Sequence, residues 1–274
     1  MAIWHLGFST TKRGTLFHGE AERREAVRVL AQVAGDQLAL FSIVYEHEHM
    51  LAQEDERHIK ALGSKIQHAL SGVAKVPLNE PWCERVDGLQ HCKKLLQYFL
   101  TQPSHHKVAV HDALWTGSCF QDLAGARVID ELKLPIWDLL PGVPRHVIYE
   151  HVGLPSQSIE AVTLEQVGVL GAVKLAAAAS AALAVDPCLR GRSTQVLRAR
   201  GVAVTLGQQA QIPPQRMRWA LGLTQHGYYG ALGRPADEVG MRAVRRRLAI
   251  EEAVARATRS IPVTDLGRRL GLCR

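Results

Sequence analysis

Two histidines separated by one residue form the first candidate site. His47-Glu48-His49 lies in a β-branched and aromatic stretch, residues 38–52, that favours one or two strands with a bend near 45–48. Side chains at positions i and i+2 of a strand point to the same face, so His47 and His49 would present their imidazoles side by side. Two such imidazoles form half of a ligand set for a divalent metal ion.

A helix predicted over residues 89–101 carries a second pair of useful side chains. The segment YFLTQP places Tyr98 and Gln102 on one helical face at spacing i, i+4, and we expect the helix to stop at Pro103. A phenol can act as a nucleophile, and a carboxamide oxygen can complete the ligand set of a metal ion. An amphipathic helix with a partly buried tyrosine would give the same pattern without chemistry.

The elements around these residues alternate between strands and helices. Alternating residues over 2–10 predict a strand, and apolar residues at helical spacing predict helices over 20–33 and 59–73. A short strand is expected at 82–86. This order predicts an α+β domain in which helices pack on a mostly antiparallel sheet.

Turn residues dominate 104–157, which is expected to be irregular and to end in a linker near 152–158. The pattern beyond is helical, so we expect an α+β domain over 1–150 followed by an all-α domain over 158–274. The most apolar helix carries Lys174 near its middle, and we expect it to pack in a soluble domain rather than cross a membrane. The expected helices cover residues 158–184, 189–207, 213–221, 225–232 and 236–259.

Charge divides the chain at the same place. Residues 1–150 hold 16 Lys and Arg against 18 Asp and Glu, whereas residues 151–274 hold 17 against 8, a net charge of +9. All but Lys174 of these C-terminal cations are arginines, whose planar guanidinium donates two parallel hydrogen bonds to phosphate. We therefore expect the C-terminal half to bind DNA, although a codon bias would also favour arginine.

Residues 213–232 look like a helix-turn-helix in which Gly222 ends the first helix. The second helix would present Gln225, His226, Tyr228 and Tyr229 to DNA; a helical hairpin with both tyrosines packed inside is the alternative. Arginines at spacing i, i+3, i+4 form a basic face on the last helix. The expected DNA contacts are Lys12, Arg13, Arg216, Arg218, Gln225, Arg242, Arg245 and Arg246.

Taken together, the paired histidines and the Tyr-x-x-x-Gln helix resemble the HUH single-tyrosine transposases, and most closely the REP-associated tyrosine transposases. Members carry a strand ending in His-x-His and, later, a helix reading Tyr-Ile-x-x-Asn-Pro; here 49 residues separate His49 from Tyr98. The segments STTKRGTLF and ALWTGSCFQDLAG are also similar to stretches of that family. The resemblance covers roughly residues 2–130.

The resemblance implies a ferredoxin-like HUH fold and a metal-dependent reaction. His47, His49 and Gln102 would hold Mg²⁺ or Mn²⁺, and Tyr98 would attack the scissile phosphate. The implied activity is cleavage and rejoining of single-stranded or hairpin DNA through a 5′-phosphotyrosine, without ATP. Relatives work as monomers or dimers, so a homodimer is compatible with the resemblance.

Glu48 departs from the family, which usually has an apolar residue there, and Tyr45-Glu46 replace the usual Pro-Asn. A buried unpaired carboxylate is costly, so Glu48 is expected to reach solvent, pair with a cation or join the metal shell. These changes keep open a second hypothesis, a domesticated DNA-binding regulator with weak catalysis on the same fold. Relaxases place the tyrosine before the histidines, and nothing suggests the helicase partner domain of a rolling-circle initiator, so both classes are disfavoured.

The remaining signals concern location. Five scattered cysteines without a CxxC pair argue against a disulfide scaffold or zinc ribbon and fit a reducing cytosol. The N-terminal residues lack the apolar run of a signal peptide. We expect a bacterial cytoplasmic protein associated with the nucleoid.

Overall fold

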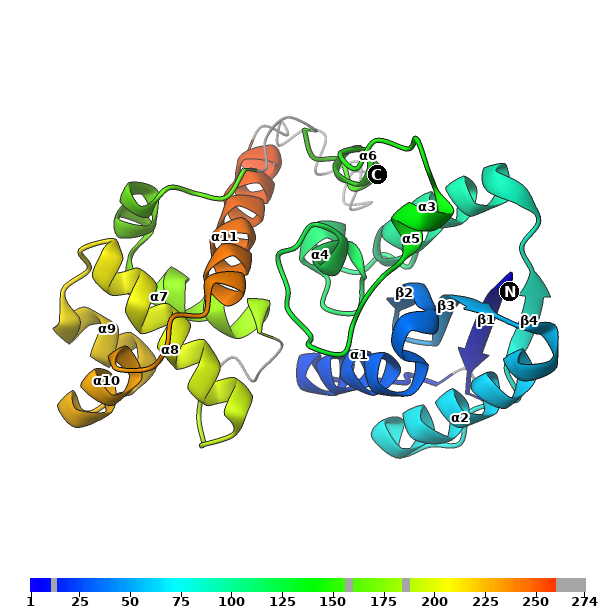
Figure 1. The fold of residues 1–274 in the computed structure, drawn as a ribbon, viewed down its shortest axis with the longest axis horizontal. Helices are drawn as coiled ribbons and strands as arrows, with labels where there is room; N and C mark the ends of the chain where they lie inside the picture. The colour runs from blue at the N-terminus through cyan, green and yellow to red at the C-terminus, as the bar shows by residue number, and fades with distance from the viewer. Residues whose placement is uncertain (11–13, 156–159, 184–187, 260–274) are drawn as a thin grey trace, which may run out of the picture.

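The computed structural model describes residues 1–10, 14–155, 160–183 and 188–259. Its N-terminal part is built on a four-stranded sheet in the order β2-β3-β1-β4, and every neighbouring pair is antiparallel (Figure 1). This arrangement confirms the predicted α+β class with an antiparallel sheet. The strands are β1 (Ala2–Ser9), β2 (Leu38–Ile43), β3 (His47–Glu54) and β4 (Trp82–Arg85).

Helices cover both faces of the sheet. On one face, α1 (Glu20–Ala34) and α2 (Glu56–Ala74) pack against each other, and Leu6 of β1 lies against Gly63 of α2. On the opposite face lies α3 (Gly88–His105), whose Phe99 ring contacts the ring of His5 (Figure 1). Because neighbouring residues of a strand face opposite sides, His5 and Leu6 mark the two faces.

The bend predicted near residues 45–48 is the turn between β2 and β3. The backbone N–H of Val44 donates to the carbonyl of His47 at 3.0 Å, which closes this turn. The ring of Tyr45 packs edge-on against Trp115, 5.5 Å away between ring centroids. The turn therefore places His47 at the first position of β3.

The prediction that the third helix stops at Pro103 is wrong, because α3 continues to His105. Proline lacks an N–H, but in the last turn of a helix this removes only one intrahelical hydrogen bond. The helix closes where the N–H of His106 donates to the carbonyl of Gln102 at 3.0 Å. This extra turn carries His105 and His106 into the pocket that His47 lines.

The stretch 104–155 is more ordered than expected, and the end of the linker expected near 152–158 lies outside the described residues. Arg127 organises it by pairing with the carboxylate of Asp122 and donating to the carbonyls of Thr116 and Ser118 at 2.6 and 2.9 Å. Both side chains of this ion pair are buried, so the pair stabilises the conformation of the loop from its interior. The short helices of the stretch are η2 (Asp112–Leu114), α4 (Phe120–Leu123), α5 (Ile136–Leu139) and α6 (Val147–His151); a similar turn, η1 (Gly35–Gln37), precedes β2.

The C-terminal part is mostly helical, as predicted, and encloses a second core. The last helix takes part in both cores: Val244 and Leu248 lie in the second core, whereas Ile250 and Val254 lie in the core of the sheet domain. Figure 1 shows this helix on the side of the helical part that faces the sheet domain. The helices are α7 (Leu164–Ala182), α8 (Thr194–Gln209), α9 (Pro214–Leu221), α10 (Gln225–Leu232) and α11 (Glu238–Arg259).

Helix α7 is long and apolar enough to cross a membrane by length and composition, with a mean hydropathy of 1.2. Its helical geometry is interrupted at Gly171, where φ is 82° and ψ is 176°. The helix packs against α8 and α11, and Lys174 forms an ion pair with Glu252 of α11 at 2.5 Å. Helix α7 is thus packed against two other helices of the C-terminal part.

Candidate active site

The two histidines of the His-x-His motif lie on the same face of β3, the face that α3 covers. Their ring centroids are 4.7 Å apart, and both side chains are half-buried. In the register of the sheet, His47 lies opposite Ser9 and His49 opposite Gly7. The alternation predicted from the sequence therefore does bring both imidazoles together.

Tyr98 reaches this pair from α3. Its hydroxyl oxygen lies 3.2 Å from Nε2 of His49. The side chain is 38% exposed, so the hydroxyl is held by a histidine and still open to solvent. A nucleophile that attacks a large substrate needs this combination of anchoring and access.

His5 is a member of the site that the sequence did not single out. It lies on β1 on the same face as Gly7 and Ser9, and its Nε2 is 3.1 Å from Nδ1 of His49. The strand periodicity of residues 2–10 already placed His5 on one face with these residues, but the partner strand was not known. The rings of His5, His49 and Tyr98 thus form a connected chain across the sheet and α3.

Burial makes these histidines weak bases. It lowers the pKa of His49 to about 3, with further lowering from His47, His5 and His106. Burial, and then His91, lower the pKa of His5 to about 4. Burial and His106 also lower the pKa of His47. At neutral pH the imidazoles of His5, His47 and His49 are therefore uncharged, and each has a ring nitrogen whose lone pair can accept a proton or a metal ion.

Gln102 lies one helical turn beyond Tyr98 and is 1% exposed. Its Oε1 is buried without a hydrogen-bond partner among the described residues. An interaction of the amide with the ring of His47 raises the pKa of that histidine against the larger effect of burial, but its geometry falls outside that of a normal hydrogen bond. An amide oxygen without a partner is costly to bury. The carboxamide and the neutral imidazoles therefore fit the ligand set of a divalent cation.

An open pocket of about 510 Å³ leads to these side chains. The ring of His106 lies 4.5 Å from that of His47 between centroids, and His105 lines the same pocket. Trp82 of β4 forms another wall and is 51% exposed. His105 and His106 directly follow the predicted helix, and the sequence left open a role for them near the metal or on DNA; Trp82 was not singled out as a site residue.

Glu48 does none of the three things expected of it. Its side chain is on the opposite face of β3 from the histidines, is 0% exposed, and has no hydrogen-bond partner for either oxygen among the described residues. Burial raises the pKa of Glu48 well above its usual value. Burial therefore disfavours the charged form of this carboxyl in the core, where its strand neighbours are Phe8 and Ile43.

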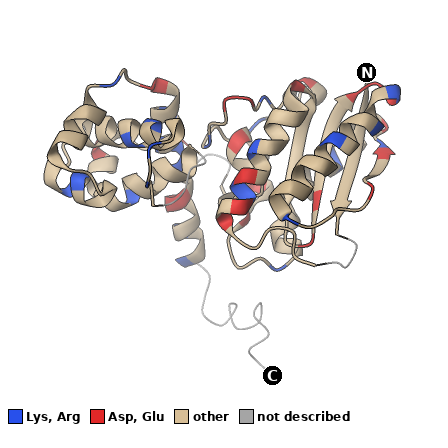
Figure 2. Ribbon diagram, turned by 90° about the horizontal axis from the view of Figure 1, so that it is seen from below, with Lys and Arg blue, Asp and Glu red and all other residues tan. Residues whose placement is uncertain are grey.

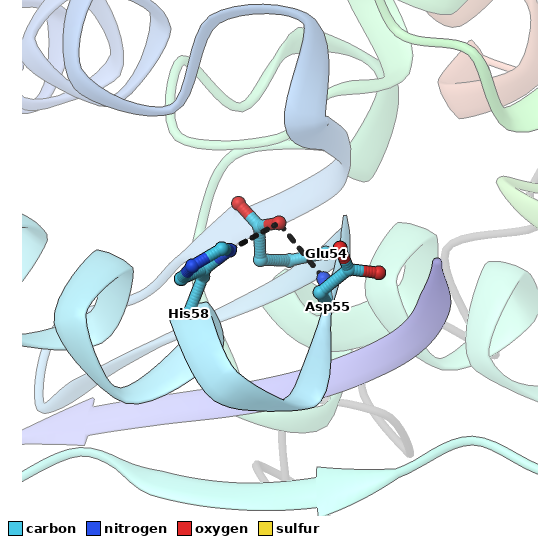
Figure 3. Close-up of side chains that lie close together, drawn as sticks. All are labelled: Glu54, Asp55 and His58. Carbon is cyan, nitrogen blue, oxygen red and sulfur yellow. Dashed lines mark hydrogen bonds and ion pairs between the residues drawn. The ribbon is translucent and has the colours of Figure 1, made fainter.

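A second cluster of ligand-type groups lies at the far end of β3 and the start of α2, and consists of Glu54, Asp55 and His58 (Figure 3). Local contacts account for it: Glu54 accepts from the N–H of Asp55 at 2.8 Å, and the N-terminal amine pairs with Asp55 at 3.3 Å. The nearest nitrogen of His58 is 3.9 Å from Glu54. The cluster therefore carries no argument for a metal ion.

The arginines expected to contact DNA have different surroundings. Arg242 is exposed on α11, whereas Arg245 donates to the carbonyl of Val162 at 2.6 Å and Arg246 donates to that of Ala124 at 3.3 Å. Arg216 on α9 is exposed, and Arg218 is half-buried. Figure 2 shows basic residues spread over the C-terminal helices. Lys12 and Arg13 lie outside the described residues.

Helices α9 and α10 are joined by a short turn, as the helix-turn-helix pattern predicts. Gly222 ends α9 with a left-handed backbone (φ 60°), and the Thr224 hydroxyl caps α10 by accepting from the N–H of Gly227 at 3.1 Å. Tyr228 is 2% exposed and belongs to the core, so it cannot face DNA as expected. Tyr229 and Trp219 are 56% and 79% exposed. Gln225 and His226 are exposed on the same helix as Tyr229.

The chain matches no protein-family model, no curated protein and no solved structure. Its chemistry is therefore argued from the side chains that the fold brings together.

Proposed function

We propose that this protein is an HUH-type, single-tyrosine DNA endonuclease and strand transferase, similar to the transposases that its motifs resemble. The observation that carries the proposal is the contact of the Tyr98 hydroxyl with His49, beside the buried, unpartnered Oε1 of Gln102. The strand and helix order β-α-β-β-α-β is that of a ferredoxin-like fold and is consistent with the proposal.

His47, His49 and Gln102 are the residues that would hold Mg²⁺ or Mn²⁺, and the bound ion would supply a Lewis acid for the scissile phosphate. Tyr98 provides the nucleophilic oxygen. When that oxygen bonds to phosphorus, the bond from phosphorus to the 3′ oxygen breaks; the phenol loses its proton, and the leaving oxygen gains one as a 3′-OH. The product is a 5′-phosphotyrosine, and reversal of the same step rejoins DNA without ATP.

The histidine chain has a role in this step. When the Tyr98 hydroxyl donates to Nε2 of His49, the proton of that ring sits on Nδ1 and is donated to Nε2 of His5. The same tautomer puts the lone pair of His49 on Nε2, which would bind a metal ion in place of the Tyr98 hydroxyl. His5 is thus a positioning residue that selects the useful tautomer of His49.

The proposal is tested with a single-stranded DNA hairpin and Mn²⁺. A label at the 3′ end of the DNA should move with the protein on a denaturing gel, because the nucleophile takes the 5′-phosphate of the downstream fragment. A label at the 5′ end should leave on a fragment with a free 3′-OH. Tyr98→Phe should abolish the adduct and keep DNA binding, since only the nucleophilic oxygen is removed. Wild-type levels of adduct in that variant would overturn the proposal.

One observation favours a second function. The buried acid of Glu48 lies directly between the two candidate ligands in the sequence, and any ionisation of it would disturb the strand that positions them. A non-catalytic DNA-binding regulator on the same fold would tolerate this. Specific DNA binding without an adduct, in Mn²⁺ and with every hairpin tried, would favour the regulator.

A further inference from the structure

A basic cavity of about 430 Å³ lies where α11 meets the loop between α4 and α6. The segment between α4 and α6 contributes Arg127, Trp137 of α5 and Arg145, and α11 contributes Arg242 and Arg246. No residue that lines this cavity also lines the pocket of Tyr98 and the histidines. The cavity is therefore a separate place at which a ligand could bind.

The charges in this cavity are unbalanced. Its lining contains four arginines and a single carboxylate, Asp122, which is already paired with Arg127. Arg246 is held by a hydrogen bond to the carbonyl of Ala124 at 3.3 Å, a contact that leaves its charge uncompensated. Arg145 and Arg242 have no ion-pair partner among the described residues. Like charges gathered in one cavity repel, and a bound anion would remove that repulsion.

Backbone and aromatic contacts position two of these arginines, Arg246 and Arg145. Gly125 has a left-handed backbone (φ 63°), which favours glycine, and a Cβ at this position would displace Nη1 of Arg246. The guanidinium of Arg145 lies 5.8 Å above the ring of Trp137. The rest of the lining includes apolar side chains, among them Leu123, Val128, Ile129 and Leu134. Cations and apolar surface thus share one cavity.

We propose that this cavity binds the phosphate of a nucleotide, with the attached base against Trp137 and the apolar wall. Guanidinium groups bind phosphate oxygens through paired hydrogen bonds, and aromatic rings stack on bases of any sequence. The nucleotide is either free or part of a single-stranded DNA. That the nucleotide belongs to a DNA strand rests on the proposed function; that the cavity binds a nucleotide does not.

The first test measures thermal unfolding with sodium phosphate, deoxyadenosine 5′-monophosphate or deoxyadenosine at matched ionic strength. A ligand that binds only the folded protein raises the Tm. Phosphate and the nucleotide should raise the Tm of the wild type and of Arg57→Gln, an exposed control on α2 with the same charge change. Deoxyadenosine should not. Arg145→Gln and Arg242→Gln should lose most of the rise. No rise in the wild type, or an equal rise in Arg242→Gln and Arg57→Gln, would overturn the proposal.

The second test separates the two sources of the nucleotide. It uses the Tyr98→Phe background and a single-stranded oligonucleotide, so that binding is measured without cleavage. If the cavity holds a nucleotide of the DNA, Arg242→Gln should weaken DNA binding about tenfold relative to Arg57→Gln, the effect of one charge-assisted hydrogen bond. If DNA affinity is unchanged while the response to the mononucleotide is lost, the cavity is a free-nucleotide site. A missing phosphotyrosine adduct would overturn the proposed nuclease and leave these binding results intact.

Discussion

Nε2 of His5 on β1 lies 3.1 Å from Nδ1 of His49 on β3. The contact joins two neighbouring strands through their side chains and fixes which nitrogen of His49 faces Tyr98. A neutral imidazole offers a lone pair on one nitrogen only, so the identity of that nitrogen decides whether the site can work. His5 does not need to touch the substrate to have this effect.

Replacing His5 tests this role. His5→Ala should lower adduct formation by about 10–100-fold, the range typical of residues that orient metal ligands. His5→Gln, whose amide oxygen can accept the Nδ1 proton, should recover part of the activity. Single-turnover adduct formation is the measurement, together with the Tm of each variant. Full activity in His5→Ala would contradict the role, and a Tm loss that His5→Gln does not relieve would make the residue merely structural.

The metal site predicts a preference between ions. His47, His49 and the Gln102 oxygen form a neutral ligand set with two nitrogens, which suits Mn²⁺ better than Mg²⁺. His47→Ala and His49→Ala should each lose Mn²⁺ binding, measured by calorimetry, and lose cleavage as well; EDTA should abolish cleavage by the wild type. His68→Ala, an exposed histidine on α2 outside the Glu54, Asp55 and His58 cluster, serves as the control. Equal Mn²⁺ binding by His49→Ala and His68→Ala would refute this ligand set.

Glu48 predicts an unusual dependence of stability on pH. Its pKa is raised by burial, so the folded protein keeps a proton that the unfolded chain releases above the ordinary carboxyl value of 4.5. The free energy of unfolding therefore falls as the pH rises from that value toward the folded pKa, by up to about 1.4 kcal/mol per pH unit. Glu48→Gln has no proton to lose, so it should match the wild type near pH 4 and be more stable near pH 8. Urea denaturation at both pH values measures this, and equal stability at the higher pH would count against a buried, neutral Glu48.

Two adjacent tyrosines in α10 should behave differently. Tyr228 is buried, so Tyr228→Ala should cost about 3–5 kcal/mol of stability, as large core truncations do. Tyr229 is exposed, so Tyr229→Ala should leave the Tm unchanged and weaken binding to duplex DNA. The measurements are thermal unfolding and fluorescence anisotropy. An unchanged DNA affinity in Tyr229→Ala would remove this side chain from the DNA-binding surface.

Periodicity explains what could be predicted. The alternation of β3 and the i, i+4 spacing of α3 are local properties, and they sufficed to predict that His47 and His49 share a face and that Tyr98 and Gln102 share another. The meeting of Tyr98 with His49 is not local, because it depends on the order of strands and the packing of α3. That contact was expected from the resemblance rather than from the pattern itself.

The missed features have specific causes. No second histidine accompanies His5 in β1, so its sequence shows no pattern of a site. Only the pairing of β1 with β3 brings His5 next to His49. Pro103 predicts the end of a helix, but a proline in the last turn removes only one backbone hydrogen bond, and α3 continues to His105. The sequence predicts that Glu48 reaches solvent, a cation or the metal shell, whereas the fold buries it without a partner among the described residues, and burial raises the pKa of its carboxyl.

Helix α11 contributes side chains to both hydrophobic cores, which means the two halves of the molecule cannot swing independently without exposing apolar surface. A hinge between them is therefore opposed by the same packing that holds each half together. If the helical half binds duplex DNA while Tyr98 attacks a single strand, the distance between the bound duplex and the cleaved phosphate is fixed by the fold. Hairpins that differ only in the number of nucleotides between their stem and the cleavage point should then be cut with a sharp optimum in length.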